Sequence, residues 1–363
     1  MSDPLPRPRA VFERLPRYVA GRPATPVPGL TAYKISSNEN PYPPLPSVLE
    51  VLARAAQGIN RYPDPTNARL REAIAGRLGV DTDAIVCGTG SVGVLGHLVT
   101  AMCEPGDEVL YAWRSFEAYP IVTALAGAVS VQAPLTADAR HDLPAMAAAV
   151  TDRTRVVLVC TPNNPTGPVV TDADLRAFLA AVPPEVLVVV DEAYAEFVTE
   201  AGAADGMAFF REYPNVAVLR TFSKAYGLAG LRVGYAVAPE WLAGPLTQAA
   251  TPFGVNVLAQ EAAVASLAAY DELEVRVKEL IAERERVEDA LAAQGWELPR
   301  SQANFVWFPL GPDSTAFAAA CQERALTVRP YGDDGVRATI GERAANDRLV
   351  EIAAAWRAAP GRP

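Results

Sequence analysis

The sequence predicts an α/β protein: a mostly parallel, seven-stranded sheet sandwiched by helices, followed by a smaller α+β domain. Between residues 48 and 270, short apolar runs of β type alternate with helical patterns, as in chains that build parallel sheets. The run 186–190 is apolar at every position, which indicates a strand buried on both faces. A long, charged helical stretch over 258–294 then leads into a shorter mixed pattern.

The individual elements follow from these periodicities and from the turn residues between them. The strands expected in the large sheet are residues 84–87, 108–111, 129–132, 155–160, 186–190, 216–219 and 232–237. Helices are expected over 46–57, 68–78, 91–102, 116–126 and 172–181, with a helical turn near Gly230. In the smaller domain we expect strands at 305–308, 327–329 and 335–340 and helices at 316–323 and 345–356.

These elements divide the chain into three expected parts. Residues 1–45 are rich in proline and read as an N-terminal arm that joins the small domain. Residues 46–265 form the large domain, and residues 266–363 form a linker helix with the small C-terminal domain.

The composition argues against several classes of function. A net charge of −10 and an isoelectric point near 4.9 do not suit a nucleic-acid or anionic-membrane surface. The four cysteines lack metal-ligand or disulfide spacing, and two histidines, His97 and His141, give little support to a metal site. No apolar run reaches the ~18 residues that span a bilayer, and the N-terminus lacks the apolar core of a signal peptide. We expect a cytoplasmic protein without metal, nucleic-acid or membrane partners.

Lys224 is the most informative residue, because the chain holds only three lysines and uses arginine for its other positive charges. Lys34 lies near the start, and Lys278 lies in a charged helical stretch. Lys224 instead lies among small and apolar residues in the segment 221–232. A desolvated lysine amine can lose its proton and attack a carbonyl, which arginine cannot do. The segment therefore predicts Schiff-base chemistry.

Polar motifs follow several of the predicted strands. Residues 88–91, Gly-Thr-Gly-Ser, lie between a strand and a helix N-terminus, an arrangement that can bind phosphate, although a structural turn explains it as well. Asp191 ends the apolar strand 186–190, where a buried carboxylate requires a cationic partner or caps the next helix. Residues 162–167 follow another buried strand and would bring a side-chain amide to the same sheet edge.

Two arginines complete the candidate site. Arg232 lies eight residues after Lys224, and the two cations repel unless an anion such as a phosphate lies beside them. Arg337 lies in an alternating strand near the end of the chain. It is either a solvated strand residue or a bidentate clamp for a carboxylate.

Taken in order, these segments resemble the fold-type I pyridoxal-phosphate aminotransferases, in the branch of histidinol-phosphate and aromatic-amino-acid (phenylalanine) aminotransferases. The resemblance covers nearly the whole chain, from about residue 37 to 340. It is carried by the segments 37–42, 61–64, 88–91, 162–167, 191–194, 222–232 and 336–337.

The resemblance implies pyridoxal 5′-phosphate as cofactor and assigns the catalytic roles. Lys224 would form the Schiff base with the cofactor and then move the proton at the substrate α-carbon. Asp191 would pair with the pyridine nitrogen, which keeps the ring an electron acceptor. Asn164 and Tyr194 would hydrogen-bond the phenolic oxygen of the cofactor.

The resemblance also assigns the groups that bind phosphate. Gly90, Ser91, Ser223 and Arg232 would hold the cofactor phosphate. Tyr62 would reach a phosphate in the partner subunit, which implies a homodimer with shared active sites.

On the substrate side, the resemblance places Arg337 against the substrate carboxylate, or against the phosphate of histidinol phosphate, and Tyr42 on the pocket wall. Phe116 takes the position at which many family members stack a tyrosine ring on the cofactor. The apolar ring face preserves the stacking, but a hydroxyl contact is lost. An alternative alignment places Tyr119 there.

The substrate follows from three further segments. Residues 113–116, 301–307 and 328–332 look like those of the aromatic-amino-acid aminotransferases, so we expect transfer between phenylalanine or tyrosine and a 2-oxo acid such as 2-oxoglutarate. Arg329 supports the alternative of a histidinol-phosphate aminotransferase, since a further cation suits a phosphate-bearing substrate. A pyridoxal-phosphate decarboxylase shares much of this motif set and is the third possibility.

Overall fold

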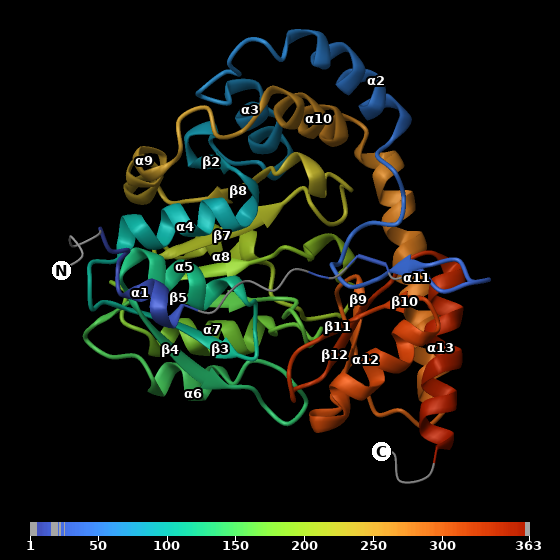
Figure 1. The fold of residues 1–363 in the computed structure, drawn as a ribbon. Helices are drawn as coiled ribbons and strands as arrows, with labels where there is room; N and C mark the ends of the chain where they lie inside the picture. Colours follow the sequence, from blue (N-terminus) through green and yellow to red (C-terminus); the bar gives the residue numbers. More distant parts are fainter. Residues whose placement is uncertain (1–5, 16–20, 22, 25, 360–363) are drawn as a thin grey trace, which may run out of the picture.

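The computed structural model describes residues 6–15, 21, 23–24 and 26–359. A large twisted sheet runs through its centre, with helices on both faces (Figure 1). A second group of strands and helices, formed by the C-terminal part of the chain, packs beside it (Figure 1). Among the described residues, no helix is long and apolar enough to cross a membrane.

The central sheet has seven strands in the order β2-β8-β7-β6-β5-β3-β4. Their bounds are β2 (Ile85–Gly88), β3 (Glu108–Trp113), β4 (Val129–Pro134), β5 (Thr154–Cys160), β6 (Leu187–Asp191), β7 (Val216–Thr221) and β8 (Gly234–Val237). All neighbours are parallel except β8, which is antiparallel to β2 and to β7. The connection from β7 to β8 carries only a short 3-10 turn, and without a crossover helix the chain returns antiparallel. The mostly parallel sheet expected from the sequence is confirmed.

The burial of β6 on both faces is also confirmed. Val189 belongs to the apolar cluster under α4 (Gly90–Met102), α5 (Ala118–Ala126) and α9 (Glu240–Ala249). Its neighbours Val188 and Val190 belong to the cluster under α6 (Leu143–Ala148), α7 (Asp172–Ala181) and α8 (Gly206–Glu212). Helices α6, α8 and α9 were not predicted from the sequence. The first two are short, and α9 contains Pro245, so each lacks the long uninterrupted period that indicates a helix.

The long helical stretch expected over 258–294 is two helices, α10 (Val257–Ala268) and α11 (Tyr270–Ala293), which meet at Ala269. α10 packs on α2 (Pro46–Ala55) and α3 (Ala68–Leu78). Shorter helical segments are α1 (Val11–Arg14) and the 3-10 turns Ala56–Gly58, Thr82–Ala84, Ala195–Phe197, Ala229–Leu231 and Gly311–Asp313.

The C-terminal group is built on an antiparallel sheet of β11 (Arg329–Pro330), β12 (Val336–Thr339) and β9 (Phe305–Phe308), with α12 (Ser314–Glu323) and α13 (Arg343–Ala358). The strand expected at 327–329 is split. β10 (Leu326–Thr327) pairs in parallel with β1 (Tyr33–Lys34), whereas β11 pairs with β12. Each half therefore has a different partner. The pairing of β1 with β10 joins the end of the N-terminal arm to the C-terminal group.

Candidate active site

A cavity of about 310 Å³ lies where the carboxyl ends of β5, β6 and β7 face the sheet of β11 and β12. Most of the residues singled out from the sequence line it. They are Ser91, Phe116, Asn164, Asp191, Tyr194, Ser223, Lys224, Arg232, Arg329 and Arg337. The carboxyl edge of a parallel sheet is the usual ligand site of such folds, since loops with polar residues gather there.

Lys224 lies three residues beyond the end of β7 with its amine inside the cavity. Its Nζ donates one long hydrogen bond, 3.3 Å, to the carbonyl of Ser37. Asn40 holds the backbone in place by donating from Nδ2 to the carbonyl oxygens of Lys224 and Ala225, at 3.3 and 2.9 Å. Burial, and next the charge of Arg337, lower the pKa of Lys224 to about 7. The amine is therefore partly neutral, and able to act as a nucleophile or base, near neutral pH.

Asp191 ends β6 on the same cavity. Its Oδ2 accepts a 2.7 Å hydrogen bond from the hydroxyl of Tyr119, whereas its Oδ1 is buried without a partner among the described residues. Burial raises the pKa of Asp191 to about 6. A buried, unpaired carboxylate oxygen is costly and calls for a donor, ideally a cationic one.

The N-terminus of α4 and Arg232 form an anion-binding corner. Gly90 has φ of +75°, which favours glycine, and a Cβ there would lie 2.5 Å from Nη2 of Arg232, so that guanidinium would have to shift. Arg232 donates from Nη1 to Ser223 Oγ at 3.3 Å, and Ser91 opens the helix beside it. Free N–H groups, a helix dipole and a guanidinium thus converge, as a phosphate requires.

Arg337 crosses the cavity to meet the strand-end loop of Asn164. Its Nη1 donates to Asn164 Oδ1 at 2.5 Å and its Nη2 to the carbonyl of Ser36 at 2.8 Å, while its Nε is buried without a partner among the described residues. Nearby, Tyr194 accepts a 2.9 Å hydrogen bond from Asn38 Nδ2, and burial raises the pKa of its hydroxyl. Because Arg337 occupies the Asn164 oxygen, the amide N–H₂ is the group left to meet a ligand oxygen.

Phe116 and Tyr119 occupy different places. Phe116 lines the cavity, whereas Tyr119 is fully buried behind it and hydrogen-bonds Asp191. The two rings meet edge to face, with centroids 5.6 Å apart. Of the two alignments left open by the sequence, this geometry favours Phe116 as the ring that faces a ligand.

Two predicted residues lie away from this cavity. Tyr62 is 82% exposed, and its ring packs on Phe253 with centroids 4.6 Å apart. Tyr42 lies beside Arg276, 5.7 Å from ring centroid to guanidinium carbon, and is not part of the cavity wall of its own chain. The side chain of Asn40 accepts from the Tyr42 backbone N–H at 3.0 Å and turns the chain away. The substrate contact expected of Tyr42 therefore stays a prediction.

Glu117 and Tyr331 also line the cavity, and neither was singled out from the sequence. Glu117 forms a 2.7 Å ion pair with Arg329, and the Tyr331 ring lies 5.4 Å from Arg329 and 5.5 Å from Arg337. An acid next to the stacking position Phe116 was the one signal that could have indicated Glu117.

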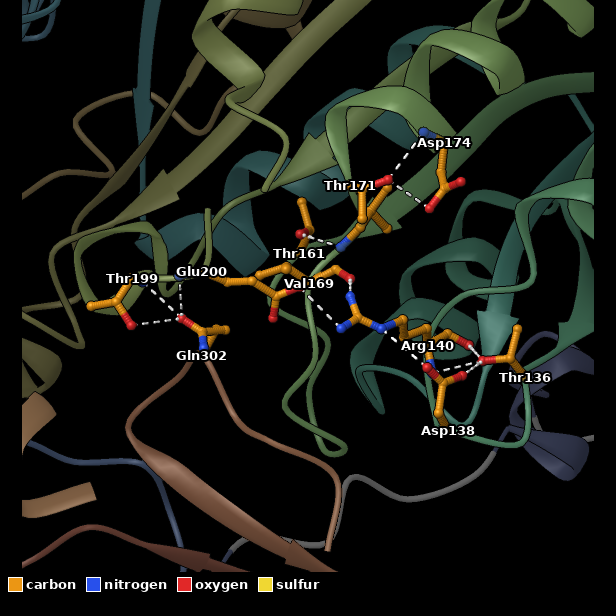
Figure 2. Close-up of polar contacts among 11 residues, drawn as sticks. Thr136, Asp138, Arg140, Thr161, Val169, Thr171, Asp174, Thr199, Glu200 and Gln302 are labelled. Atoms are coloured by element: carbon orange, nitrogen blue, oxygen red, sulfur yellow. Dashed lines mark hydrogen bonds and ion pairs between the residues drawn. The ribbon is translucent and has the colours of Figure 1, made fainter. Parts of the chain in front are cut away.

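A polar network around Arg140 links the loops that follow β4, β5 and β6 (Figure 2), and the loop after β5 also carries Asn164. Arg140 donates to the carbonyl of Val169 at 2.7 Å and pairs with Glu200 at 3.0 Å. Gln302, just before β9, accepts from the backbone N–H groups of Thr199 and Glu200 at 2.7 and 3.0 Å. The strand-end loops of the large sheet are thereby tied to each other and to the C-terminal group.

This arrangement defines a class of enzyme in which a desolvated lysine faces an anion-binding corner and an unpaired acid. More particularly, the chain belongs to the aminotransferase class I and II family, whose model matches residues 32–352. A protein named aromatic amino acid aminotransferase from Streptomyces coelicolor is 56% identical over 98% of this chain and 99% of its own length. A protein of the same name from Rhodococcus jostii is 55% identical over 96% of this chain and 95% of its own length.

Solved structures give the same result for the fold. A histidinol-phosphate aminotransferase from Sinorhizobium meliloti, in complex with pyridoxal-5′-phosphate, is 29% identical with a TM-score of 0.86, over 98% of this chain and 100% of its own. A mutant aspartate aminotransferase from Thermus thermophilus, 24% identical over 89% of this chain and 92% of its own, has a TM-score of 0.77 and shows the shared fold alone.

Proposed function

We propose that this protein is a pyridoxal-phosphate-dependent aminotransferase that moves an amino group between an aromatic L-amino acid, phenylalanine or tyrosine, and a 2-oxo acid such as 2-oxoglutarate. The observation that carries the proposal is the buried Lys224 amine, with a pKa lowered to about 7, in one cavity with Asp191 and the Arg232 corner. These three groups fit the aldehyde, the ring nitrogen and the phosphate of the cofactor. The unpartnered Oδ1 of Asp191 and the Cβ-free approach at Gly90 support the fit.

Pyridoxal phosphate, when bound, supplies a carbonyl for the amine and a ring that delocalises electrons from the substrate α-carbon. This chain supplies the rest. Lys224 removes and returns the α-proton, Asp191 holds the ring nitrogen protonated, and Arg337 binds the substrate carboxylate through its guanidinium. Asn164 and Tyr194 lie on the cavity wall where they would orient the cofactor oxygen.

The aromatic substrate is supported by the names of the relatives and by the charge balance of the cavity. Relatives that match nearly the full length at about 55% identity carry the name aromatic amino acid aminotransferase. Arg329, which would suit the phosphate of histidinol phosphate, is already paired with Glu117. Histidinol phosphate stays the second candidate donor, because Arg329 does line the cavity.

We further propose a homodimer with shared active sites, in which Tyr62 reaches the cofactor phosphate of the partner subunit. Its high exposure, and the fact that it does not line the cavity of its own chain, support this assignment. The three-part division at residues 45 and 265 is part of the same proposal, and the cytoplasmic location stays a prediction.

The test is a side-by-side assay of phenylalanine, tyrosine and histidinol phosphate as amino donors to 2-oxoglutarate, with carbon dioxide release measured in parallel. We expect transfer from the aromatic donors. Lys224→Ala should abolish both amino transfer and covalent attachment of the cofactor. The attachment is measured by reducing the Schiff base with borohydride and determining the mass of the peptide that carries residue 224. Preference for histidinol phosphate would overturn the substrate, carbon dioxide release would indicate a decarboxylase, and an active Lys224→Ala variant would overturn the chemistry.

A further inference from the structure

Two arginines lie side by side on one wall of the cavity. Arg329 on β11 and Arg337 on β12 are directly paired in the antiparallel register, and both are buried. Tyr331 contacts both, with its ring 5.4 and 5.5 Å from the two guanidinium carbons. Like charges on neighbouring strands repel unless an anion neutralises one of them.

An acidic side chain meets only one of the two arginines. Arg329 Nη2 lies 2.7 Å from Glu117 Oε2, in a pair whose side chains are 8% and 25% exposed. Arg337 meets neutral oxygens, those of Asn164 and Ser36, and within the described part of the chain it forms no salt bridge. The positive charge of Arg337 is therefore available to a ligand carboxylate, whereas that of Arg329 is already neutralised by Glu117.

The position of Glu117 makes this pairing stable. Glu117 is the N-cap residue of α5, where the helix dipole favours a negative charge. Together with Arg329 and Tyr331 it also lines a neighbouring cavity of about 450 Å³, so the ion pair separates the two spaces. A substrate side chain that points toward this wall meets a neutral pair next to the Phe116 ring.

We propose that Glu117 is a specificity-determining residue that masks Arg329 and so selects against amino donors with a second anionic group. The proposal rests on the proposed function, since it assumes that Arg337 takes the substrate carboxylate. A second carboxylate or phosphate must displace Glu117 from Arg329 before it can bind, whereas an uncharged aromatic side chain packs without disturbing the pair. 2-Oxoglutarate, the acceptor in the proposed function, carries a second carboxylate as well, so it too must displace Glu117 from Arg329 when it binds.

The test is the first half-reaction of the cofactor-loaded enzyme with phenylalanine, glutamate and histidinol phosphate, measured separately for each donor. Glu117→Gln should raise kcat/KM for glutamate or histidinol phosphate, relative to phenylalanine, about tenfold or more, because Arg329 is unmasked. The donor that gains identifies the second anion as carboxylate or phosphate. By calorimetry, the same variant should bind glutarate more tightly and 3-phenylpropionate about as tightly as the wild type does.

Two variants make the test specific. Asp334→Asn removes a carboxylate from the nearby pair with Arg114 but leaves Glu117 in place, and it should not change the donor ratios. The double variant, Glu117→Gln with Arg329→Gln, should lose the rise in kcat/KM for the anionic donor that the single variant Glu117→Gln shows. Glu117→Ala carries the same expectation as Glu117→Gln and replaces it if the Gln variant does not fold.

The outcomes separate the two proposals. If the wild type does not accept an amino group from phenylalanine, the proposed function fails. If the wild type does so but the donor ratios and glutarate affinity of Glu117→Gln stay unchanged, the inference about Glu117 fails alone. A gain that persists in the double variant also overturns it, because Arg329 would then not be the receptor.

Discussion

At the scale of single residues, burial in one cavity shifts the pKa values of both Asp191 and Lys224 toward neutral pH. Burial disfavours charge, so it raises the pKa of Asp191 to about 6 and lowers that of Lys224 to about 7. Both groups therefore titrate close to neutral pH, which suits proton transfer. Each also costs folding free energy in the absence of a ligand, because a charge or a polar group is buried without full compensation.

Asp191→Asn should therefore stabilise the cofactor-free protein while impairing transfer. The folded carboxyl binds its proton more tightly than the unfolded one, so the wild type loses stability as pH rises from 3.8 to about 6. That loss corresponds to roughly 3 kcal/mol and is complete above pH 6. The amide lacks this titration but keeps an acceptor for Tyr119. Thermal unfolding at pH 4.5 and pH 8 measures the difference, which should be larger at pH 8. A pH-independent difference between variant and wild type would contradict this account.

At the scale of elements, the start of α4 couples a backbone requirement to the anion site. The positive φ of Gly90 disfavours any other residue there, and an added Cβ would also displace the guanidinium of Arg232. Gly234 on β8 has a firmer constraint, since a Cβ there would lie 2.4 Å from the backbone nitrogen of Ser91. The strand-turn-helix unit thus positions its N–H groups by close backbone approach.

Gly90→Ala should weaken binding of pyridoxal phosphate by about tenfold or more, because φ strain of ~1–2 kcal/mol adds to displacement of Arg232. Gly96→Ala is the matched control, since it lies in the same helix and a Cβ there meets nothing within 4 Å. Fluorescence titration of the cofactor-free variants gives both dissociation constants. Equal affinities for the two variants would show that Gly90 serves only as a turn.

At the scale of the whole molecule, the sheet and most of the cavity could be predicted because both follow from local pattern. Runs of buried apolar residues ended at the same edge, so Asp191, Asn164 and Lys224 had to lie together once the strands were parallel. The resemblance to the aminotransferases then assigned a role to each of these side chains. The antiparallel β8 and the short α6 and α8 could not be read this way, since connection lengths and brief helical turns leave little periodic signal.

The pairing of Glu117 with Arg329 was beyond sequence reasoning for a different reason. The two residues are 212 positions apart, and their contact depends on how the chain brings β11 to the N-terminus of α5. Arg329 was singled out as a further cation that would suit a phosphate-bearing substrate, and in the structure it has an acidic partner. Charge type can be read from the sequence, but whether a charge is already neutralised depends on tertiary contacts.

The proposed homodimer can be tested through Tyr62, because this residue does not line the cavity of its own chain. We expect it to reach the anion-binding corner of the partner subunit. If sites are shared in this way, Lys224→Ala and Tyr62→Ala damage different halves of each site. Mixing the two inactive or weak variants under conditions that exchange subunits should create hybrids with one intact site, and about a quarter of wild-type activity at equal mixing. The measurement is amino transfer before and after exchange, with Lys224→Ala mixed with itself as control. If Tyr62 served its own chain, each hybrid would carry one site with only the Lys224 defect and one with only the Tyr62 defect, and mixing would restore nothing.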